Sequence, residues 1–155
     1  MTTQLSPEVL GILELDETNF FAKRDSVRML LALGNIDEAT TRLDSLNKRY
    51  PKNPDVDLLM GDLYLSKDNF EAAAARYVTA VRSQSSLAPA LIKSYQLAIE
   101  GHGEDGFIMA FEGLARDYER NTFSTNLLAD YYLTIGNNEK AKPLYLSLSN
   151  ATDYV

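Results

Sequence analysis

The stretch LLMGDLYLSKDNFEAAAARYVTAV, residues 58–81, carries the pattern that decides the fold. In its first part leucines recur at the spacing of one face of a helix. In its second part, from Phe70 to Val81, small and large apolar residues again recur three and four positions apart. An Asn-containing break, Lys67-Asp68-Asn69, separates the two. The segment therefore predicts two short helices joined by a tight turn.

The same break occurs elsewhere at a regular interval. It is found at 33–36, at 67–70 and at 135–138, so the second interval is twice the first. The missing break falls at His102-Gly103, inside the glycine-rich segment 101–106. The period is therefore 34, without insertion or deletion. It divides the chain into unit 1 (20–53), unit 2 (54–87), unit 3 (88–121) and unit 4 (122–155), preceded by residues 1–19.

A 34-residue helix–turn–helix unit resembles the tetratricopeptide repeat family. The residues that carry the resemblance are the small ones of the first helix (Gly61, Ala129), the small ones of the second helix (Ala39, Ala73, Ala141), the large ones four positions beyond (Leu43, Tyr77, Phe111, Tyr145) and a terminal Pro51. Unit 3 departs, because Tyr95 and Phe107 stand at the small-residue positions. The resemblance implies an all-α helical solenoid of antiparallel hairpins with about nine helices.

The ninth helix is expected near the N-terminus. Residues 12–17, Ile-Leu-Glu-Leu-Asp-Glu, resemble the end of a repeat, and Ser6-Pro7-Glu8 is a plausible helix start. Residues 6–15 are thus interpreted as the second helix of a truncated preceding repeat. On this interpretation the chain is an excised segment of a longer array. The alternative is a short native N-terminal cap helix.

The composition excludes several classes of function. The chain of 155 residues has no cysteine and one histidine, His102, which excludes a disulfide framework, thiolate metal sites and any site that needs two histidines. The net charge of −7 argues against binding to nucleic acid or anionic membranes. No apolar run approaches the ~20 residues that span a bilayer, and the first residues lack a signal-peptide pattern. We predict no catalytic residues, metal or other cofactor, and no direct membrane insertion of this segment.

The resemblance implies that the first helices line a groove that holds a peptide or a partner helix. The groove candidates are Phe21, Arg24, Arg28 and Leu31; Asp55, Leu58, Asp62 and Leu65; Pro89, Ile92, Gln96 and Ile99; and Phe123, Asn126, Asp130 and Leu133. The family's best-known groove clamps a C-terminal carboxylate with Lys, Arg and Asn. Because Asp62 and Asp130 stand where that clamp needs Asn or Lys, we predict a ligand with apolar anchors instead.

Charge is distributed unevenly along the chain. Residues 1–19 carry −4 and units 1 to 4 carry +3, −2, −3 and −1. The basic residues Arg42, Lys48, Arg49 and Lys52 lie on or after the second helix of unit 1. They are consistent with a solvated helix face or with a docking patch for an acidic partner.

The glycine-rich segment around His102 is the most unusual in the chain. His102 with Glu104 and Asp105 could suggest a metal, but one imidazole and two adjacent carboxylates are too few for a zinc site and do not match a calcium loop. The interpretation favoured here is an inter-helix turn. His102 would respond to pH if a carboxylate lay nearby.

The last unit has two unusual features. Pro143 lies inside its second helix, which predicts a helix that starts late, near Lys140, or is kinked. No polar capping helix follows, which predicts partial exposure of Leu144, Leu146 or Leu148 and self-association through exposed solenoid ends. Most aromatic residues, such as Tyr64 and Tyr132, are assigned to packing positions, whereas Phe21 and Phe123 are candidates for ligand contact.

The predicted function is a non-catalytic protein–protein interaction scaffold. The alternatives are a purely structural spacer and, from a different class, an enzyme that uses the His102 loop. The runs 61–65, 71–77 and 128–133 are similar to tetratricopeptide lipoproteins of bacterial exosortase (PEP-CTERM) systems, and type IV pilus assembly lipoproteins are a rival resemblance. Either would imply a periplasmic location, and otherwise the chain would be cytoplasmic.

Overall fold

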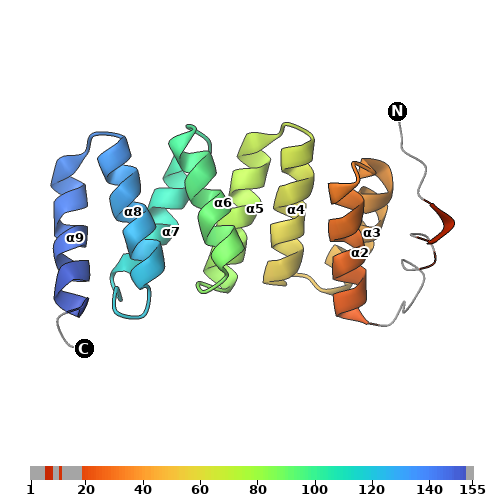
Figure 1. Cartoon of the computed structure of the whole chain (residues 1–155), viewed down its shortest axis with the longest axis horizontal. Helices are drawn as coiled ribbons and strands as arrows, with labels where there is room; N and C mark the ends of the chain where they lie inside the picture. Colours follow the sequence, from red (N-terminus) through yellow and green to blue (C-terminus); the bar gives the residue numbers. More distant parts are fainter. Residues whose placement is uncertain (1–5, 9–10, 12–18, 153–155) are drawn as a thin grey trace.

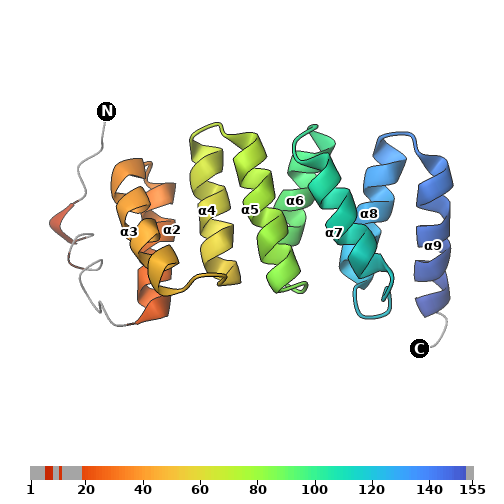
Figure 2. The same ribbon diagram turned by 180° about the vertical axis from the view of Figure 1, so that it is seen from behind.

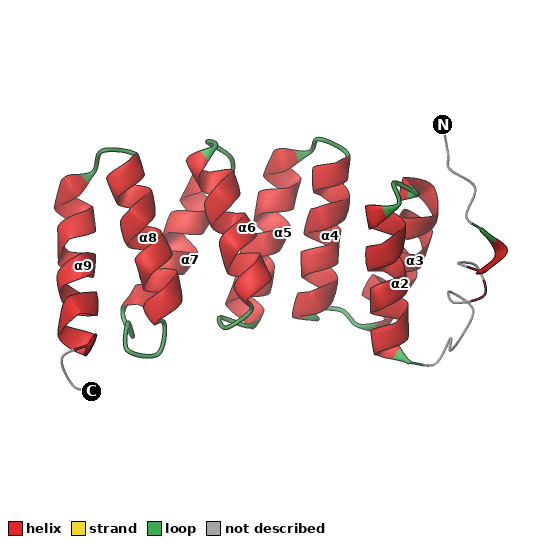
Figure 3. Cartoon of the chain, in the orientation of Figure 1, coloured by secondary structure: helices red, strands yellow, loops and turns green. Residues whose placement is uncertain are grey.

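The computed structural model describes residues 6–8, 11 and 19–152 of the chain, and its regular elements there are all helices (Figures 1 and 3). Within the described residues there are eight of them: α2 (Phe20–Ala32), α3 (Ile36–Arg49), α4 (Pro54–Ser66), α5 (Phe70–Ser83), α6 (Ala88–Ile99), α7 (Glu104–Ala115), α8 (Thr122–Thr134) and α9 (Asn138–Thr152). None of the helices in this described part is long and apolar enough to cross a membrane.

The helices form a row in which each hairpin packs on the next (Figure 1). The first helices α2, α4, α6 and α8 begin at residues 20, 54, 88 and 122, and the second helices at 36, 70, 104 and 138, so both series keep the constant interval of the repeat. α6 and α8 lie in front of α7 in Figure 1, and α7 lies in front in the reversed view of Figure 2. The first helices therefore share one face of the molecule, called the first-helix face below.

The count of about nine helices is corrected to eight in the described part of the chain. The helix expected over 6–15 lies mostly outside the described residues; of it, Pro7, Glu8 and Gly11 are described and are helical. The late start expected for the last helix is wrong, because α9 begins at Asn138 and continues through Pro143. Glu139 and Pro143 are both exposed, so the carbonyl group that loses its helical partner can bond to water.

Asparagine precedes both helices of units 1, 2 and 4, and its side chain caps the helix at Asn19, Asn53, Asn69 and Asn137 but not at Asn35 or Asn121. Asn19 and Asn53 stand before first helices, and Asn69 and Asn137 before second helices. Each side chain accepts a hydrogen bond from a backbone N–H of the first turn, at 2.8–3.3 Å. Such a cap contributes ~1 kcal/mol to a helix start. Unit 3 lacks these caps, since Leu87 and Gly103 hold the two places.

The turn within unit 3 differs from the others. In units 1, 2 and 4 the turn residue Gly34, Asp68 or Gly136 has a positive φ, and these recur at the repeat interval. In unit 3 the left-handed residue is Gly101, one position early, and a second one, Gly103, precedes α7. A Cβ at Gly103 would lie 2.5 Å from the Cβ of Ala74 on α5. Glycine is therefore required both by the backbone angle and by the close approach of unit 2.

The core of the described residues consists of two large clusters that meet along α4 and a small one formed by Leu30 and Ala39. The first joins units 1 and 2 through Val27, Leu43, Leu46, Val56, Leu59, Met60 and Leu63. The second runs from α4 to α9 and contains the aromatic side chains Tyr77, Phe107, Phe111, Tyr131 and Tyr132. Tyr64 packs partly buried against both clusters. The aromatic residues at the repeat packing positions thus fill the interfaces between helices.

Candidate functional site

The first-helix face holds the residues predicted to contact a ligand, and their exposure differs along its length. Phe21 is 60% exposed, Phe123 48% and Ile92 40%. Gln96, Asn126 and Arg28 also reach solvent, whereas Arg24, Asp55, Asp62 and Asp130 are half-buried. Leu58 requires a correction: it is 5% exposed and lies in the core against α5, so its side chain does not face solvent.

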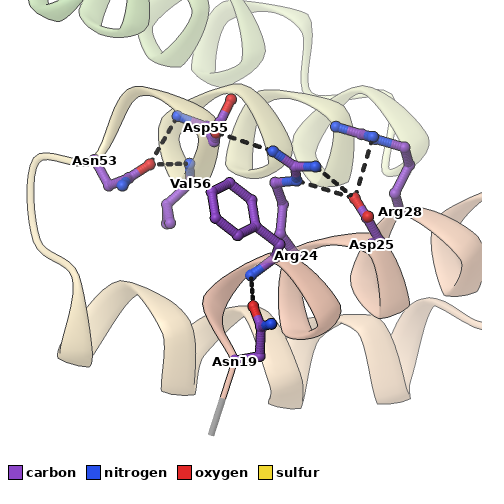
Figure 4. Close-up of polar contacts among 8 residues, drawn as sticks. Asn19, Arg24, Asp25, Arg28, Asn53, Asp55 and Val56 are labelled. Atoms are coloured by element: carbon purple, nitrogen blue, oxygen red, sulfur yellow. Dashed lines mark hydrogen bonds and ion pairs between the residues drawn. The ribbon is translucent and has the colours of Figure 1, made fainter. Parts of the chain in front are cut away.

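The N-terminal part of this face is occupied by ion pairs. In Figure 4, Arg24 on α2 lies between Asp25 on the same helix and Asp55 on α4. The Nη2 of Arg24 is 2.9 Å from Asp25 Oδ1, and its Nη1 is 3.3 Å from Asp55 Oδ2. Arg28 also reaches Asp25, at 3.3 Å. Arg24 and Arg28, the cations among the groove candidates, are therefore already paired with neighbouring carboxylates.

The middle of the face is neutralised in the same way. Asp62 on α4 accepts a hydrogen bond of 2.7 Å from the Tyr77 hydroxyl on α5 and forms an ion pair with Lys93 on α6. The Lys93 Nζ also lies 5.5 Å from the centroid of the Tyr77 ring, within cation–π distance. Asp62, the acidic groove candidate of α4, thus lies at an ion-paired junction between units 2 and 3.

The C-terminal part of the face is apolar. Ile92 and Ile99 on α6 are each 40% exposed, and Phe123 and Leu133 on α8 are 48% and 54% exposed. α6 packs directly on α8, so these side chains lie on adjoining helices. Asp130 is the acidic residue here. It accepts hydrogen bonds from the Tyr145 hydroxyl and, at 3.5 Å, from Asn126, and has no cationic partner among the described residues.

Two tyrosines of unit 4 have strongly raised pKa values. Burial, together with the hydrogen bond to Asp130, raises the pKa of Tyr145 to about 12. Burial and a hydrogen bond to Glu104 likewise raise the pKa of Tyr131 to about 12. Both environments favour the neutral phenol, because the low dielectric and the adjacent carboxylate oppose a second negative charge.

These shifts predict alkaline destabilisation. A tyrosine ionises near pH 10 in an unfolded chain, so each group contributes its full stabilisation below about pH 10 and loses it as the pH rises towards 12. The loss is up to about 1.4 kcal/mol per pH unit for each group. Urea unfolding followed from pH 9 to 11.5 should show this decline, and the Tyr131→Phe/Tyr145→Phe variant should show a shallower one. Equal slopes in the two proteins would contradict the assignment.

The segment around His102 joins two units and does not form a metal centre. Nδ1 of His102 lies 3.1 Å from Oε1 of Glu71, and Oε2 of the same carboxylate accepts a 3.2 Å hydrogen bond from the Gly103 N–H. The imidazole stacks on Phe70, with centroids 4.8 Å apart. The described residues contain no group of three or more potential metal ligands. The sequence did not show whether a carboxylate lies near His102. The structure places Glu71 of α5, in the preceding unit, beside it.

The basic residues of unit 1 lie on and just beyond α3. Arg42 pairs with Glu38 one turn earlier, at 2.7 Å. Lys48, Arg49 and Lys52 reach solvent, and the Arg49 guanidinium lies 5.8 Å from the ring centroid of Tyr50. These three basic side chains are therefore exposed at the end of α3 and just beyond it.

Comparison with known proteins identifies the class. Residues 30–86 match the family model of the tetratricopeptide repeat, and this segment runs from α2 to the end of α5. The segment from 30 to 86 therefore carries tetratricopeptide repeats, which typically mediate protein–protein interactions. No curated protein and no solved structure matches the chain. The narrower resemblance to exosortase-system or pilus-assembly lipoproteins has no support among these comparisons.

Proposed function

We propose that the first-helix face binds an extended or helical segment of another protein, chiefly through units 3 and 4. The observation that carries the proposal is the row of exposed apolar side chains on α6 and α8, formed by Ile92, Ile99 and Phe123. These groups have water as their neighbour on one side, and burying them against apolar side chains of a ligand would be favourable.

The two halves of the face would contribute differently. Around α2 and α4 the charged groups already pair with one another. A charged ligand that displaced one partner would break an existing ion pair to form a new one, so the net gain in binding free energy would be small. On α6 and α8, a ligand can cover Ile92, Ile99 and Phe123 without breaking an ion pair. We therefore assign affinity to the C-terminal half. Phe21, whose ring centroid lies 5.2 Å from the guanidinium carbon of Arg24, would supply one further apolar contact at the N-terminal end.

The proposal is tested by selecting peptides that bind the whole chain from a random peptide library. Bound peptides should be rich in apolar residues, and Ile92→Ser and Phe123→Ser should each weaken their binding about tenfold, since burying one such side chain is worth ~1.5–3 kcal/mol. Binding is measured by fluorescence anisotropy with labelled peptides.

The control is Met109→Ser. Met109 is 68% exposed, but it lies on α7 and not on a first helix. This variant should leave peptide affinity unchanged. If all three variants bind equally well, or if no peptide is selected at all, the first-helix face is not a binding surface and the chain acts as a structural spacer.

A further inference from the structure

Units 2 and 4 contain the same pair of polar side chains. Asp62 and Tyr77 in unit 2 correspond, two repeats later, to Asp130 and Tyr145 in unit 4. In both units the tyrosine hydroxyl of the second helix donates a hydrogen bond to Oδ1 of the aspartate of the first helix. The two sites therefore have the same local construction.

In unit 2 this pair holds a cation from the following helix. Lys93 of α6 forms an ion pair with Asp62, and its ammonium lies over the Tyr77 ring. α6 packs along α5, and its Ala90, Leu91 and Ala98 are buried in the same cluster as Tyr77. A helix with small and apolar residues on one face, and a lysine beside that face, thus covers the pair in unit 2.

In unit 4 the corresponding place is open among the described residues. Asp130 has no ion-pair partner among the described residues, and Lys140 of α9 pairs with Glu112 at 3.1 Å. Next to Tyr145 lies a cleft of about 440 Å³, bordered by Leu133, Ala141, Lys142 and Leu146. Leu133 is 54% exposed and Leu146 is 55% exposed.

The cleft corresponds to the surface that α6 covers in unit 2. Leu133, Ala141 and Leu146 stand where unit 2 has Leu65, Ala73 and Val78. Ala73 and Ala141 are both buried, at 0% and 2% exposure, but Val78 is 5% exposed whereas Leu146 is 55% exposed. The surface that α6 covers in unit 2 is therefore exposed in unit 4, where it forms an apolar cleft.

We propose that the cleft between α8 and α9 binds a helix of a separate protein that places a lysine on the Asp130–Tyr145 pair, as Lys93 is placed on Asp62 and Tyr77. The lysine ammonium would pair with the Asp130 carboxylate and lie against the Tyr145 ring. The apolar face of the partner helix would cover Leu133 and Leu146.

The charges of the cleft further define the partner. Lys142 lies at its border and stands where unit 2 has Ala74, the residue in contact with Gly103 just after α6. An acidic side chain near the end of the partner helix would meet this ammonium. A second copy of the chain fits less well, because its first described helix, α2, carries Asp25 in the place of Lys93. The partner helix is thus expected to carry a central lysine and an acidic end.

The sequence of α6 itself meets these requirements and provides the probe. A synthetic peptide of residues 87–100, LAPALIKSYQLAIE, has Lys93 at its centre and Glu100 at its end. Its affinity for the full chain is measured by isothermal titration calorimetry. Asp130→Asn in the chain should weaken binding about tenfold, as expected for the loss of one charge-assisted hydrogen bond. Lys93→Met in the peptide should cause a similar loss.

A double-mutant cycle distinguishes direct contact from an indirect effect. Asp130→Asn should change the affinity of the Lys93→Met peptide less than twofold, because the lysine that it pairs with is absent. Asp62→Asn is the matched control: it alters the equivalent pair, which α6 already covers, and should leave peptide affinity unchanged. Met109→Ser, at an exposed position of α7, should also have no effect, whereas a loss on Ile92→Ser would mean that the peptide binds the first-helix face and not this cleft.

Three further results would overturn the proposal. The first is absence of peptide binding by the full chain, and the second is an equal loss for both peptides on Asp130→Asn. The third concerns the partner: if sedimentation shows that the chain alone forms a dimer, and Asp130→Asn dissociates it, the cleft is filled by a second copy.

Discussion

Phe107→Ala is expected to destabilise the protein by about 3–5 kcal/mol, the usual cost of removing a buried phenylalanine ring. The result would be counterintuitive from sequence alone, because the other three units carry alanine at this position: Ala39, Ala73 and Ala141. Phe107 is 1% exposed, and its ring centroid lies 4.1 Å from that of Phe111 and 4.9 Å from that of Tyr131. Restoring the repeat's usual residue would therefore leave a cavity between α7 and α8.

The measurement is urea unfolding monitored by circular dichroism, with Met109→Ala as the control on the same helix. Met109 is 68% exposed, so this change should alter stability by no more than about 0.5 kcal/mol. Should Phe107→Ala unfold at the same urea concentration as the unaltered protein, unit 3 would tolerate the usual small residue and its aromatic cluster would not be required.

Gly61→Ala is expected to destabilise the protein by ~1–3 kcal/mol, the usual cost of overpacking a core, even though alanine is the better helix former. Gly61 is buried in α4, and a Cβ there would lie 2.3 Å from Cε1 of Tyr77. Tyr77 is itself fully buried, and its hydroxyl is bonded to Asp62. Its ring therefore cannot move aside without breaking contacts in both units 2 and 3.

Gly113→Ala provides the matched control for this prediction. Gly113 also lies within a helix, α7, but it is exposed, and a Cβ there would have no atom within 4 Å. This variant should be stabilised by up to about 1 kcal/mol, the difference in helix propensity. Thermal melts of the two variants should therefore shift in opposite directions. A stabilised Gly61→Ala protein would mean that the Tyr77 ring has room to turn.

Much of the fold could be predicted from spacing. Stretches with helical apolar patterns, separated by Asn- or Gly-containing breaks, indicated hairpins, and the first helices do begin at the predicted constant interval. A further signal was present but was not used: asparagine precedes both helices of units 1, 2 and 4. At Asn19, Asn53, Asn69 and Asn137 the side chain bonds to a free N–H group of the first turn, so these residues mark helix starts more directly than the apolar pattern does. In unit 4, Asn137 marks the start of α9 at Asn138, two residues ahead of the late start expected near Lys140.

Less of the candidate site could be predicted. Counting along the helices selected residues of one face, but it could not show that Arg24 pairs with Asp55 or Lys93 with Asp62, because each pair joins side chains of different units. It also placed Leu58 on the surface, whereas that side chain is buried against α5. These outcomes depend on how closely neighbouring hairpins stack.

The sequence by itself determined the period, the helices and the repeat class, since all three depend on interactions within a single repeat: apolar spacing, capping side chains and turn residues. Tertiary structure alone decided which charges are neutralised and which apolar groups stay exposed. Unit 3 shows why. Its large Phe107 and its Gly103 turn fit only because α5 and α8 leave matching space, and that space is a property of the neighbouring units. The contrast between covered Asp62 and open Asp130 has the same origin, because identical local pairs differ only in what the adjacent helix supplies.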